Sequence, residues 1–407
     1  MELNEKQRNA LLTRLARVVE KKFYDPKLNG VNWRGLVEER RSRIVHAGSL
    51  EEFEKEIYDL LKQLGASHIG LFHQSRPRGS SRQALAATLC KIETEYGTRW
   101  VFQDIHSEGP ADLVGLESGD VLLRVHNREI VPPESPSFAM GAGNSITIAK
   151  RNGRTVNLTL SVPHPKSLKP PVVVPRTVSF RRLPAGIGLL QVTMFPGIVG
   201  IDVAKEMTDA VGSLDCDRLV IDLRGNTGGG IGCLRLMSLL CPDKRPIGYS
   251  ISRRAAERGC RPEELPKFDR IPAQKWQLLP LLLQWAFRDR SVALITEGLG
   301  DRKFHQHIAI LVNEHSASAT EMVAAFAVEN RLATIIGTNT AGRLMGASAY
   351  KVGFGYRLAL PVAVFKTWQG KTLEGVGVSP DIEIPFRKEV TNRDRDPQLE
   401  AAINALS

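Results

Sequence analysis

Two serines one residue apart, Ser316 and Ser318, stand between a predicted strand and a predicted helix. The apolar run "HIAILVN" ends at residue 313, and the helix-like run "ATEMVAAFAVENR" begins at Ala319. A hydroxyl at such a junction lies beside backbone N–H groups at the positive end of a helix, where a developing oxyanion is stabilised. A serine in this place can equally do no more than cap the helix. The local sequence therefore leaves a nucleophile and a cap as alternatives.

The second feature that could take part in chemistry is a glycine-rich turn. The nearly continuous apolar run "DRLVIDLRG" leads into Gly228, Gly229 and Gly230. Glycine permits unusual dihedral angles and close backbone approach, so this turn could supply another N–H donor to an oxyanion. An ordinary turn after a buried strand has the same composition. Two later stretches also contain glycine, "GTNTAGR" at 337–343 and "TLEGVGVSPDIEI" at 372–384.

Strands and helices alternate around these turns. The strand-like run 187–195 is followed by the helical run 200–214, and the strand at 307–313 by a helix and another strand, "LATIIGT". This alternation predicts βαβ units around a mostly parallel sheet, and hence an α/β fold. The stretch from Cys241 to Arg302 reads as irregular, and we expect an insertion or lid there.

Residues 1–72 are predicted to form an N-terminal helical region. Apolar residues between Leu11 and Val19 recur at spacings of three and four, which is the period of one helix face. A second helix is predicted in "SLEEFEKEIYDLLKQLG", with Ser49 as its cap and Gly65 at its end. The region closes on "GASHIGLF", which contains Ser67 and His68.

Residues 73–163 resemble a PDZ domain. The run "RWVFQDIHSEGPADLVGLESGDVLLRVHNREI" has the strand, short helix and "GD" turn of such domains, and two further strand-like pieces follow it. The resemblance implies that an extended peptide binds in a groove by adding to the sheet edge. No glycine-rich carboxylate loop precedes this run, so the peptide specificity stays open. Residues 164–178 are proline-rich and are predicted to be a linker.

The motifs "DLR-x-N-x-GG", "SAS-A-(S/T)-E", "GT-x-T-x-G" and "EG-x-GV-x-PD" follow one another in this chain. In that order they resemble the serine peptidases of C-terminal processing (tail-specific) type and the tricorn core. The resemblance implies a ClpP/crotonase-like α/β catalytic core at 179–388, followed by a tail at 389–407. It implies hydrolysis of unfolded or C-terminally presented polypeptides through an acyl-enzyme. Ser318 takes the nucleophile position, and Gly229 and Ala319 take those of the oxyanion-hole donors.

The general base is where the chain departs from the tail-specific pattern. Those peptidases keep a lysine where this chain has Arg343, and a guanidinium stays protonated and cannot act as a base. The tricorn-like branch uses a histidine of a "SH" pair instead. This resemblance assigns the base to His68, with Ser67 and Glu374 orienting its ring.

Other residues remain open as the base. Lys351 and Lys366 could replace the missing lysine, although neither fits the motif. His315 is nearer to the serine in the sequence, at the same strand end. His305 and His307 could face one side of a strand and bind metal, but no third ligand is evident. We therefore expect neither a metal nor a cofactor.

Composition limits the other function classes. The chain has 407 residues, a formal net charge of +11 and 42% hydrophobic residues, enough for more than one domain. Basic and acidic residues are interspersed, so no nucleic-acid partner is expected. Five cysteines without a C-x-x-C pair, no signal-peptide pattern and no long apolar run predict a cytoplasmic protein that does not bind membranes.

Two other functions stay open beside proteolysis, as does the formation of a homo-oligomer. Interphotoreceptor retinoid-binding proteins resemble the core, so the chain could be a catalytically retired relative that binds a hydrophobic ligand or peptide. A scaffold that works through its PDZ domain alone is the other alternative.

Overall fold

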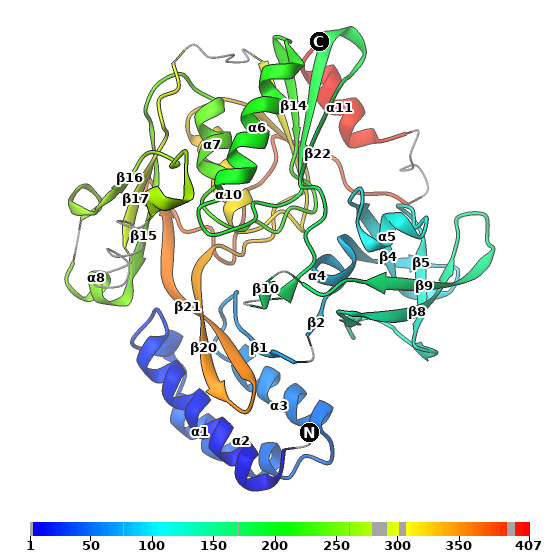
Figure 1. Cartoon of the computed structure of the whole chain (residues 1–407), viewed down its shortest axis with the longest axis vertical. Coiled ribbons are helices and arrows are strands. Elements are labelled where there is room, and N and C mark those ends of the chain that lie inside the picture. The colour runs from blue at the N-terminus through cyan, green and yellow to red at the C-terminus, as the bar shows by residue number, and fades with distance from the viewer. Residues whose placement is uncertain are drawn as a thin grey trace.

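The computed structural model describes residues 3–75, 77–165, 167–168, 171–259, 261–278, 291–300, 307–388 and 395–407. Three parts can be followed in Figure 1: a bundle of N-terminal helices, a small antiparallel sheet, and a larger α/β core from which a long hairpin reaches back to the helices. The predicted mixed α/β class is confirmed.

The core is built on a six-stranded sheet in the order β12-β13-β14-β18-β19-β22. Five of its strands are parallel to their neighbours, and β12 is antiparallel to β13. The strands are β12 (Val178–Arg182), β13 (Ile187–Val192), β14 (Arg218–Asp222), β18 (His307–Val312), β19 (Thr334–Gly337) and β22 (Ile382–Glu383). Because the strands are parallel, the loops after β14 and β18 leave the sheet at the same edge.

Helices cover both faces of this sheet, which explains why its strands are apolar on both sides. The larger core cluster includes Leu190, Ile221, Ile310, Val323 and Phe326, from strands and helices alike. On the other face the C-terminal helix, red in Figure 1, packs on the strands. The first face carries α6 (Ile201–Leu214), α7 (Cys233–Leu239) and α10 (Ala319–Glu329), and the second carries α11 (Pro397–Ala405).

Residues 241–302 were expected to be irregular, but their described part contributes strands to a second sheet with the order β1-β21-β15-β17-β16. Much of the described part of this stretch is regular, because β15 pairs with β21 more than a hundred residues later, β17 pairs with β15, and β16 pairs with β17. Such long-range pairing leaves little local periodicity to read. The elements are β15 (Pro246–Ser252), α8 (Arg253–Glu257), β16 (Lys267–Phe268), β17 (Val292–Ile295), β20 (Met345–Gly353) and β21 (Tyr356–Thr367). The remainder of the expected lid, residues 260, 279–290 and 301–302, lies outside the described residues.

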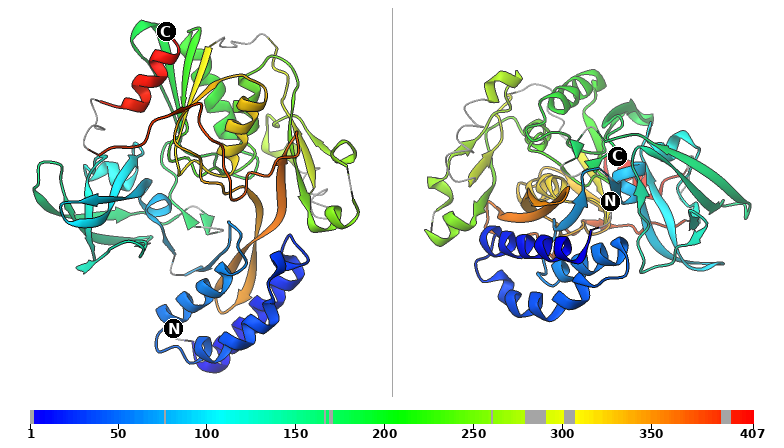
Figure 2. Two further views of the ribbon diagram at one scale, coloured as in Figure 1. Left: turned by 180° about the vertical axis from the view of Figure 1, so that it is seen from behind. Right: turned by 60° about the horizontal axis from the view of Figure 1, so that its bottom comes forward.

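The predicted N-terminal helices are present and pack on the far end of the β20–β21 hairpin, as both views in Figure 2 show. Their apolar stripes, including Leu15 and Phe53, form one cluster with Leu358 and Leu360 of β21. Strand β1 (Gly70–His73) then pairs with β21, with Gly70 opposite Ala359. This pairing fixes the chain directly after Ser67 and His68. The helices are α1 (Glu5–Lys22), α2 (Trp33–Val45) and α3 (Leu50–Lys62).

The small sheet has the order β3-β4-β5-β8-β9, is antiparallel, and contains the strands expected from the sequence. Residues 77–162 are called the small-sheet region below. Its elements are β2 (Arg78–Gly79), α4 (Ser81–Leu85), β3 (Ala87–Thr94), β4 (Gly97–Ile105), α5 (Pro110–Leu113), β5 (Val121–Val125), β6 (Arg128–Glu129), β7 (Phe138–Ala139), β8 (Ala142–Ala149) and β9 (Thr155–Val162).

The proline-rich segment after the small sheet is not wholly irregular. It contains the short pair β10 (Ser167–Leu168) and β11 (Pro171–Val172), and its last predicted residue, Val178, already begins β12. Within the described ranges, no helix combines the length and apolar character needed to cross a membrane.

Candidate active site

Ser318 lies in a strained turn directly before α10. Its backbone has φ 58° and ψ −120°, a conformation that costs about 1–3 kcal/mol in a residue other than glycine and is concentrated at functional sites. The side chain makes no cap hydrogen bond to the helix. Instead the carboxylate of Glu321 accepts the N–H of Ser318 at 2.9 Å. This Glu321 contact is one half of a capping box, so Ser318 does begin the helix, but a cap alone does not require its strained backbone.

The structure separates the two serines. Ser316 is fully buried; its hydroxyl donates to the carbonyl of Leu223 at 2.8 Å and accepts the N–H of Asn313 at 3.0 Å. These contacts tie the serine turn to the end of β14. Ser318 remains partly exposed. Ser316 thus has a supporting position.

The glycine turn packs directly on the serine turn. A Cβ atom built on Gly228 would lie 2.7 Å from the backbone nitrogen of Ala319, and Gly229 has φ +136°. Phe195 holds the turn from behind, donating to the carbonyl of Gly228 and accepting from the N–H of Gly230, both within 2.9 Å. Among the described residues, the N–H groups of Gly229 and Ala319 have no acceptor. The two predicted oxyanion donors thus lie on adjoining turns with their protons available.

Two buried asparagines, which the sequence did not single out, hold these turns together. The side chain of Asn226 accepts the N–H of Gly228 and donates to the carbonyl of Val192, each at 2.8 Å. Its carbonyl accepts the N–H of Ala317 at 3.0 Å. Asn226 is fully buried, so water cannot reach these polar groups and the contacts supply the hydrogen bonds that they need. The only sequence signal was its place in the "DLR-x-N-x-GG" run.

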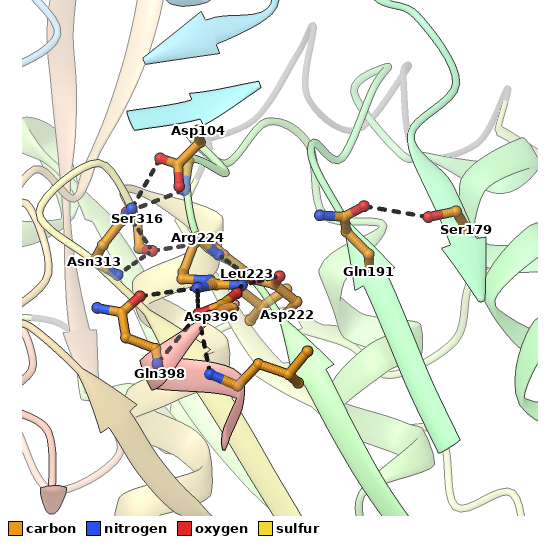
Figure 3. A network of polar contacts seen from close by, with 12 residues as sticks. Asp104, Ser179, Gln191, Asp222, Leu223, Arg224, Asn313, Ser316, Asp396 and Gln398 are labelled. Atoms are coloured by element: carbon orange, nitrogen blue, oxygen red, sulfur yellow. Dashed lines mark hydrogen bonds and ion pairs between the residues drawn. The ribbon is translucent and has the colours of Figure 1, made fainter. Parts of the chain in front are cut away.

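Asn313 does the same from the serine side. Its side-chain oxygen accepts the N–H of Gly225 at 3.0 Å, and its amide nitrogen donates to the carboxylate of Asp104 at 2.8 Å. Figure 3 shows Asp104, from the end of β4, above Asn313 and Ser316. From the same region, Arg82 donates to the carbonyl of Gly225 at 2.7 Å. The small-sheet region therefore reaches Gly225 in two ways. Arg82 bonds its carbonyl directly, and Asp104 bonds Asn313, which accepts its N–H.

A polar cavity of about 150 Å³ adjoins this contact. The ion pairs of Arg224 with Asp222 and Asp396 form one wall, and Asp104 belongs to the opposite wall, as Figure 3 shows. Burial raises the pKa of Asp104, while His315 acts against this rise. Among the described residues, His315 makes no hydrogen bond to Ser318, and its backbone N–H donates to Asn313 Oδ1 at 3.1 Å.

Ser67, His68 and Glu374 form a second group of contacts. The hydroxyl of Ser67 donates to Glu374 Oε2 at 2.9 Å, and His68 Nδ1 lies 2.7 Å from the same hydroxyl. Glu374 Oε1 accepts the N–H of Ser67 at 2.7 Å. Because the Ser67 proton points to the carboxylate, its oxygen accepts from Nδ1–H of His68. This network assigns the proton to Nδ1 and leaves the lone pair of Nε2 available.

The surroundings favour the neutral form of His68. Burial lowers the pKa of His68, Glu374 opposes that shift, and the charge of Arg343 adds to it. His68 also has a positive φ of 60°, so the backbone holds this residue in a conformation that costs about 1–3 kcal/mol. A neutral imidazole with a free Nε2 can accept a proton.

The loop 340–344 joins the two groups. The carbonyl of Arg343 accepts the N–H of Ser318 at 2.9 Å, and the N–H of Leu344 donates to Glu374 Oε2 at 2.8 Å. Glu321, which is fully buried, accepts the N–H of Arg343 at 2.8 Å. In the part of the chain that the structure describes, Ser318 and His68 share no direct hydrogen bond. Such contacts are often long without substrate and shorten in the reacting complex.

The alternative bases lie elsewhere. Lys351 is opposite Arg357 near the tip of the β20–β21 hairpin, and Lys366 is opposite Tyr249 of β15. His307 is exposed at the start of β18, and His305 lies outside the described residues. No group of three metal-binding side chains occurs among the residues described.

Residues 186–384 match the model of peptidase family S41. The matched segment carries Ser318, the glycine turn and Glu374, and it is similar to the peptidases of that family. It is 23% identical to tricorn protease homolog 1 of Streptomyces coelicolor over 95% of this chain and 34% of that protein. It is 25% identical to the carboxy-terminal processing protease CtpA of Bacillus subtilis over 70% of this chain and 54% of that protein. The chain thus spans about a third of the length of the tricorn homologue and about half that of CtpA.

Solved structures show the same fold. The photosystem II D1 C-terminal processing protease aligns over 98% of this chain and 97% of its own, with a TM-score of 0.59 and 17% identity. The S41 protease of Bacteroides fragilis NCTC 9343 aligns over 96% of both chains, with a TM-score of 0.56 and 15% identity. At these identities the likeness concerns the fold.

Proposed function

We propose that the chain hydrolyses peptide bonds in unfolded or C-terminally presented polypeptides through an acyl-enzyme on Ser318. The observation that carries the proposal is the pairing of a strained serine with two unused N–H groups on adjoining turns. A helix cap needs no such pair, whereas a tetrahedral oxyanion does. The S41 relatives support the same reaction class.

In the proposed reaction, His68 Nε2 removes the proton of Ser318 Oγ as that oxygen bonds to the scissile carbonyl carbon. The carbonyl oxygen becomes an oxyanion, held by the N–H groups of Gly229 and Ala319. The imidazolium then gives its proton to the leaving nitrogen as the C–N bond breaks. Water repeats the sequence on the acyl-enzyme, with His68 again as the base, and releases the new carboxyl end.

Ser67 and Glu374 act on this reaction through His68. The Glu374–Ser67–His68 contacts hold the proton on Nδ1 and stabilise the imidazolium that forms. Arg343 stands in place of a lysine base and remains charged throughout. The lowered pKa of the partly buried His68, together with Arg343 in the lysine position, supports the Ser-His branch over the Ser-Lys branch.

We further propose that the small-sheet region is a PDZ domain that binds substrate peptide in the groove beside its sheet edge. Its contacts through Asp104 and Arg82 place it against the glycine turn. A reducing, cytoplasmic setting is proposed because Cys90, Cys216, Cys233 and Cys241 are all free thiols.

A fluorophosphonate probe and a quenched, unfolded protein substrate test the proposal. Wild type should be labelled and active, and Ser318→Ala should lose both properties. Absence of labelling in wild type, or unchanged labelling in Ser318→Ala, would contradict it. A silent peptidase assay beside saturable binding of a hydrophobic fluorophore would support the retired, ligand-binding alternative instead.

A further inference from the structure

We propose that Arg343 binds a carboxylate of the substrate on the leaving-group side of the scissile bond. The inference rests on the proposed peptidase function and names its substrate class: polypeptides whose own chain end, or an acidic side chain, follows closely after the cleaved bond. Both sources present the same planar carboxylate, which an arginine fork binds through two parallel hydrogen bonds.

The backbone of Arg343 is fixed beside the candidate nucleophile. Its carbonyl accepts the N–H of Ser318 at 2.9 Å, and its own N–H donates to Glu321 at 2.8 Å. Its side chain is exposed. The guanidinium therefore starts from a rigid point next to the reacting serine and can reach a ligand from there.

The charge of this guanidinium has no carboxylate partner among the described residues. Arg224 and Arg235, by contrast, are both ion-paired with carboxylates of the core. The carboxylates of Glu321 and Glu374, which bond the backbone of the 340–344 loop, already accept several hydrogen bonds. Glu321 accepts from Ser318, Thr340, Gly342 and Arg343, and Glu374 accepts from Ser67 and Leu344. An anion from outside can pair with Arg343 without breaking a contact of the fold.

The position of His68 decides which side of the substrate this charge faces. The general acid that protonates the leaving nitrogen must lie on the leaving-group side. Arg343 lies in the loop between Ser318 and the His68 group, because its carbonyl accepts the N–H of Ser318 and the next residue, Leu344, donates to Glu374. A carboxylate bound by Arg343 therefore belongs to the segment released first. The α-carboxylate of the polypeptide meets this requirement when the released tail is short.

The test compares matched peptides that differ in one group. One pair ends in a free carboxylate or in an amide, and a second pair, both amidated, carries Asp or Asn two residues after the cleavage site. The wild type should prefer the carboxylate of at least one pair by roughly 10- to 100-fold in kcat/KM, the size of a hydrogen bond to a charged group. Arg343→Gln should reduce this ratio to about one, and Arg343→Lys should retain part of it.

Arg181→Gln is the matched control. Arg181 is exposed on β12, so its loss should leave the preference intact. The pair that shows the preference identifies the source: the first pair indicates the chain end, and the second an acidic side chain.

Failure of this inference is distinct from failure of the proposed function. An active wild type with ratios near one for both pairs overturns the role of Arg343 and leaves the peptidase standing. If wild type neither cleaves nor reacts with the fluorophosphonate probe, the proposed function fails. Binding of the same peptides to Ser318→Ala, with and without Arg343→Gln, needs no turnover. A carboxylate preference lost with Arg343 then supports the inference, and an equal affinity overturns it.

Discussion

The two halves of the candidate site are built in different ways. The serine half lies on adjoining turns at one edge of one parallel sheet, where Asn226 and Asn313 are completely buried and bonded on several sides. The base half joins Ser67 and Glu374, which are 307 residues apart and only partly buried. The serine half is thus part of the core, whereas the base half exists only while β1 is paired with β21.

This difference predicts different responses to substitution. Changes to the buried asparagines of the serine half should reduce both stability and activity, because their hydrogen bonds support the fold and the oxyanion donors alike. Changes in the base half should reduce activity with little loss of stability. The N-terminal helices pack on β20 and β21, and β1, which begins two residues after His68, pairs with β21. We therefore expect this packing to position His68.

The largest effect is expected for Ser318→Ala. Loss of the nucleophile should lower kcat by about 10⁴-fold or more, and the free energy of unfolding should change little because the side chain makes no cap hydrogen bond. Ser316→Ala should instead lower mainly the free energy of unfolding, by about 1–3 kcal/mol, because the buried partners of its hydroxyl are left unpaired. Ser213→Ala, on the exposed face of α6, is the control. Equal behaviour of the two site serines in both assays would contradict their assigned roles.

Ser67→Ala should have the next largest effect on activity. Without the Ser67 hydroxyl, Nδ1 of His68 loses its acceptor, and a reduction within the ~10²–10⁴ range of general-base catalysis is expected. Ser67→Thr keeps the hydroxyl and should recover part of kcat. The midpoint temperature of thermal unfolding should change little, whereas kcat should fall strongly. A Ser67→Ala enzyme with normal kcat would show that Glu374 does not act through this serine.

Asn226→Ala tests the serine half. Its removal leaves buried backbone groups of the glycine turn unpaired, so we expect a destabilisation of about 2–4 kcal/mol in denaturant unfolding. Displacement of Gly229 should lower kcat by about 10²-fold, as for loss of one oxyanion donor. Loss of activity without loss of stability would contradict the shared use of these hydrogen bonds.

The smallest effects are pH shifts, measured on an uncharged, amidated peptide. Arg343→Gln removes a positive charge that lowers the pKa of His68, so the acid limb of kcat/KM should move to higher pH. Glu374→Gln removes a negative charge that raises the same pKa, so its acid limb should move to lower pH. If the two variants shifted the acid limb in the same direction, or not at all, the limb would not reflect the ionisation of His68.

The sequence predicted the serine half more completely than its supports. Ser318, Ala319 and the glycine turn follow strands whose apolar runs are local and continuous. Asn226 and Asn313 were overlooked because a buried brace looks like any loop asparagine until its partners are known. The strands at 246–252 and 292–295 were missed for a similar reason, since their register depends on pairing with β21 and with one another rather than on local alternation.

The base half was predicted only through a resemblance. Nothing in "GASHIGLF" indicates a general base by itself. Because Glu374 lies 307 residues after Ser67 in the sequence, no motif spacing could link it to His68. The contact of Asp104 and Arg82 with the core had no sequence signal either, because each is a single charged residue within an otherwise ordinary sheet or helix.

The central claim is that His68 is the base for Ser318, and the pH dependence of fluorophosphonate inactivation tests it most directly. The wild-type rate should rise through one ionisation below the ordinary histidine pKa of about 6.5 and stay level through neutral pH. His68→Gln should react far more slowly and lack this ionisation. A wild-type rate that still climbs above pH 8, as a lysine base would give, or a His68→Gln profile equal to that of wild type, would contradict the account.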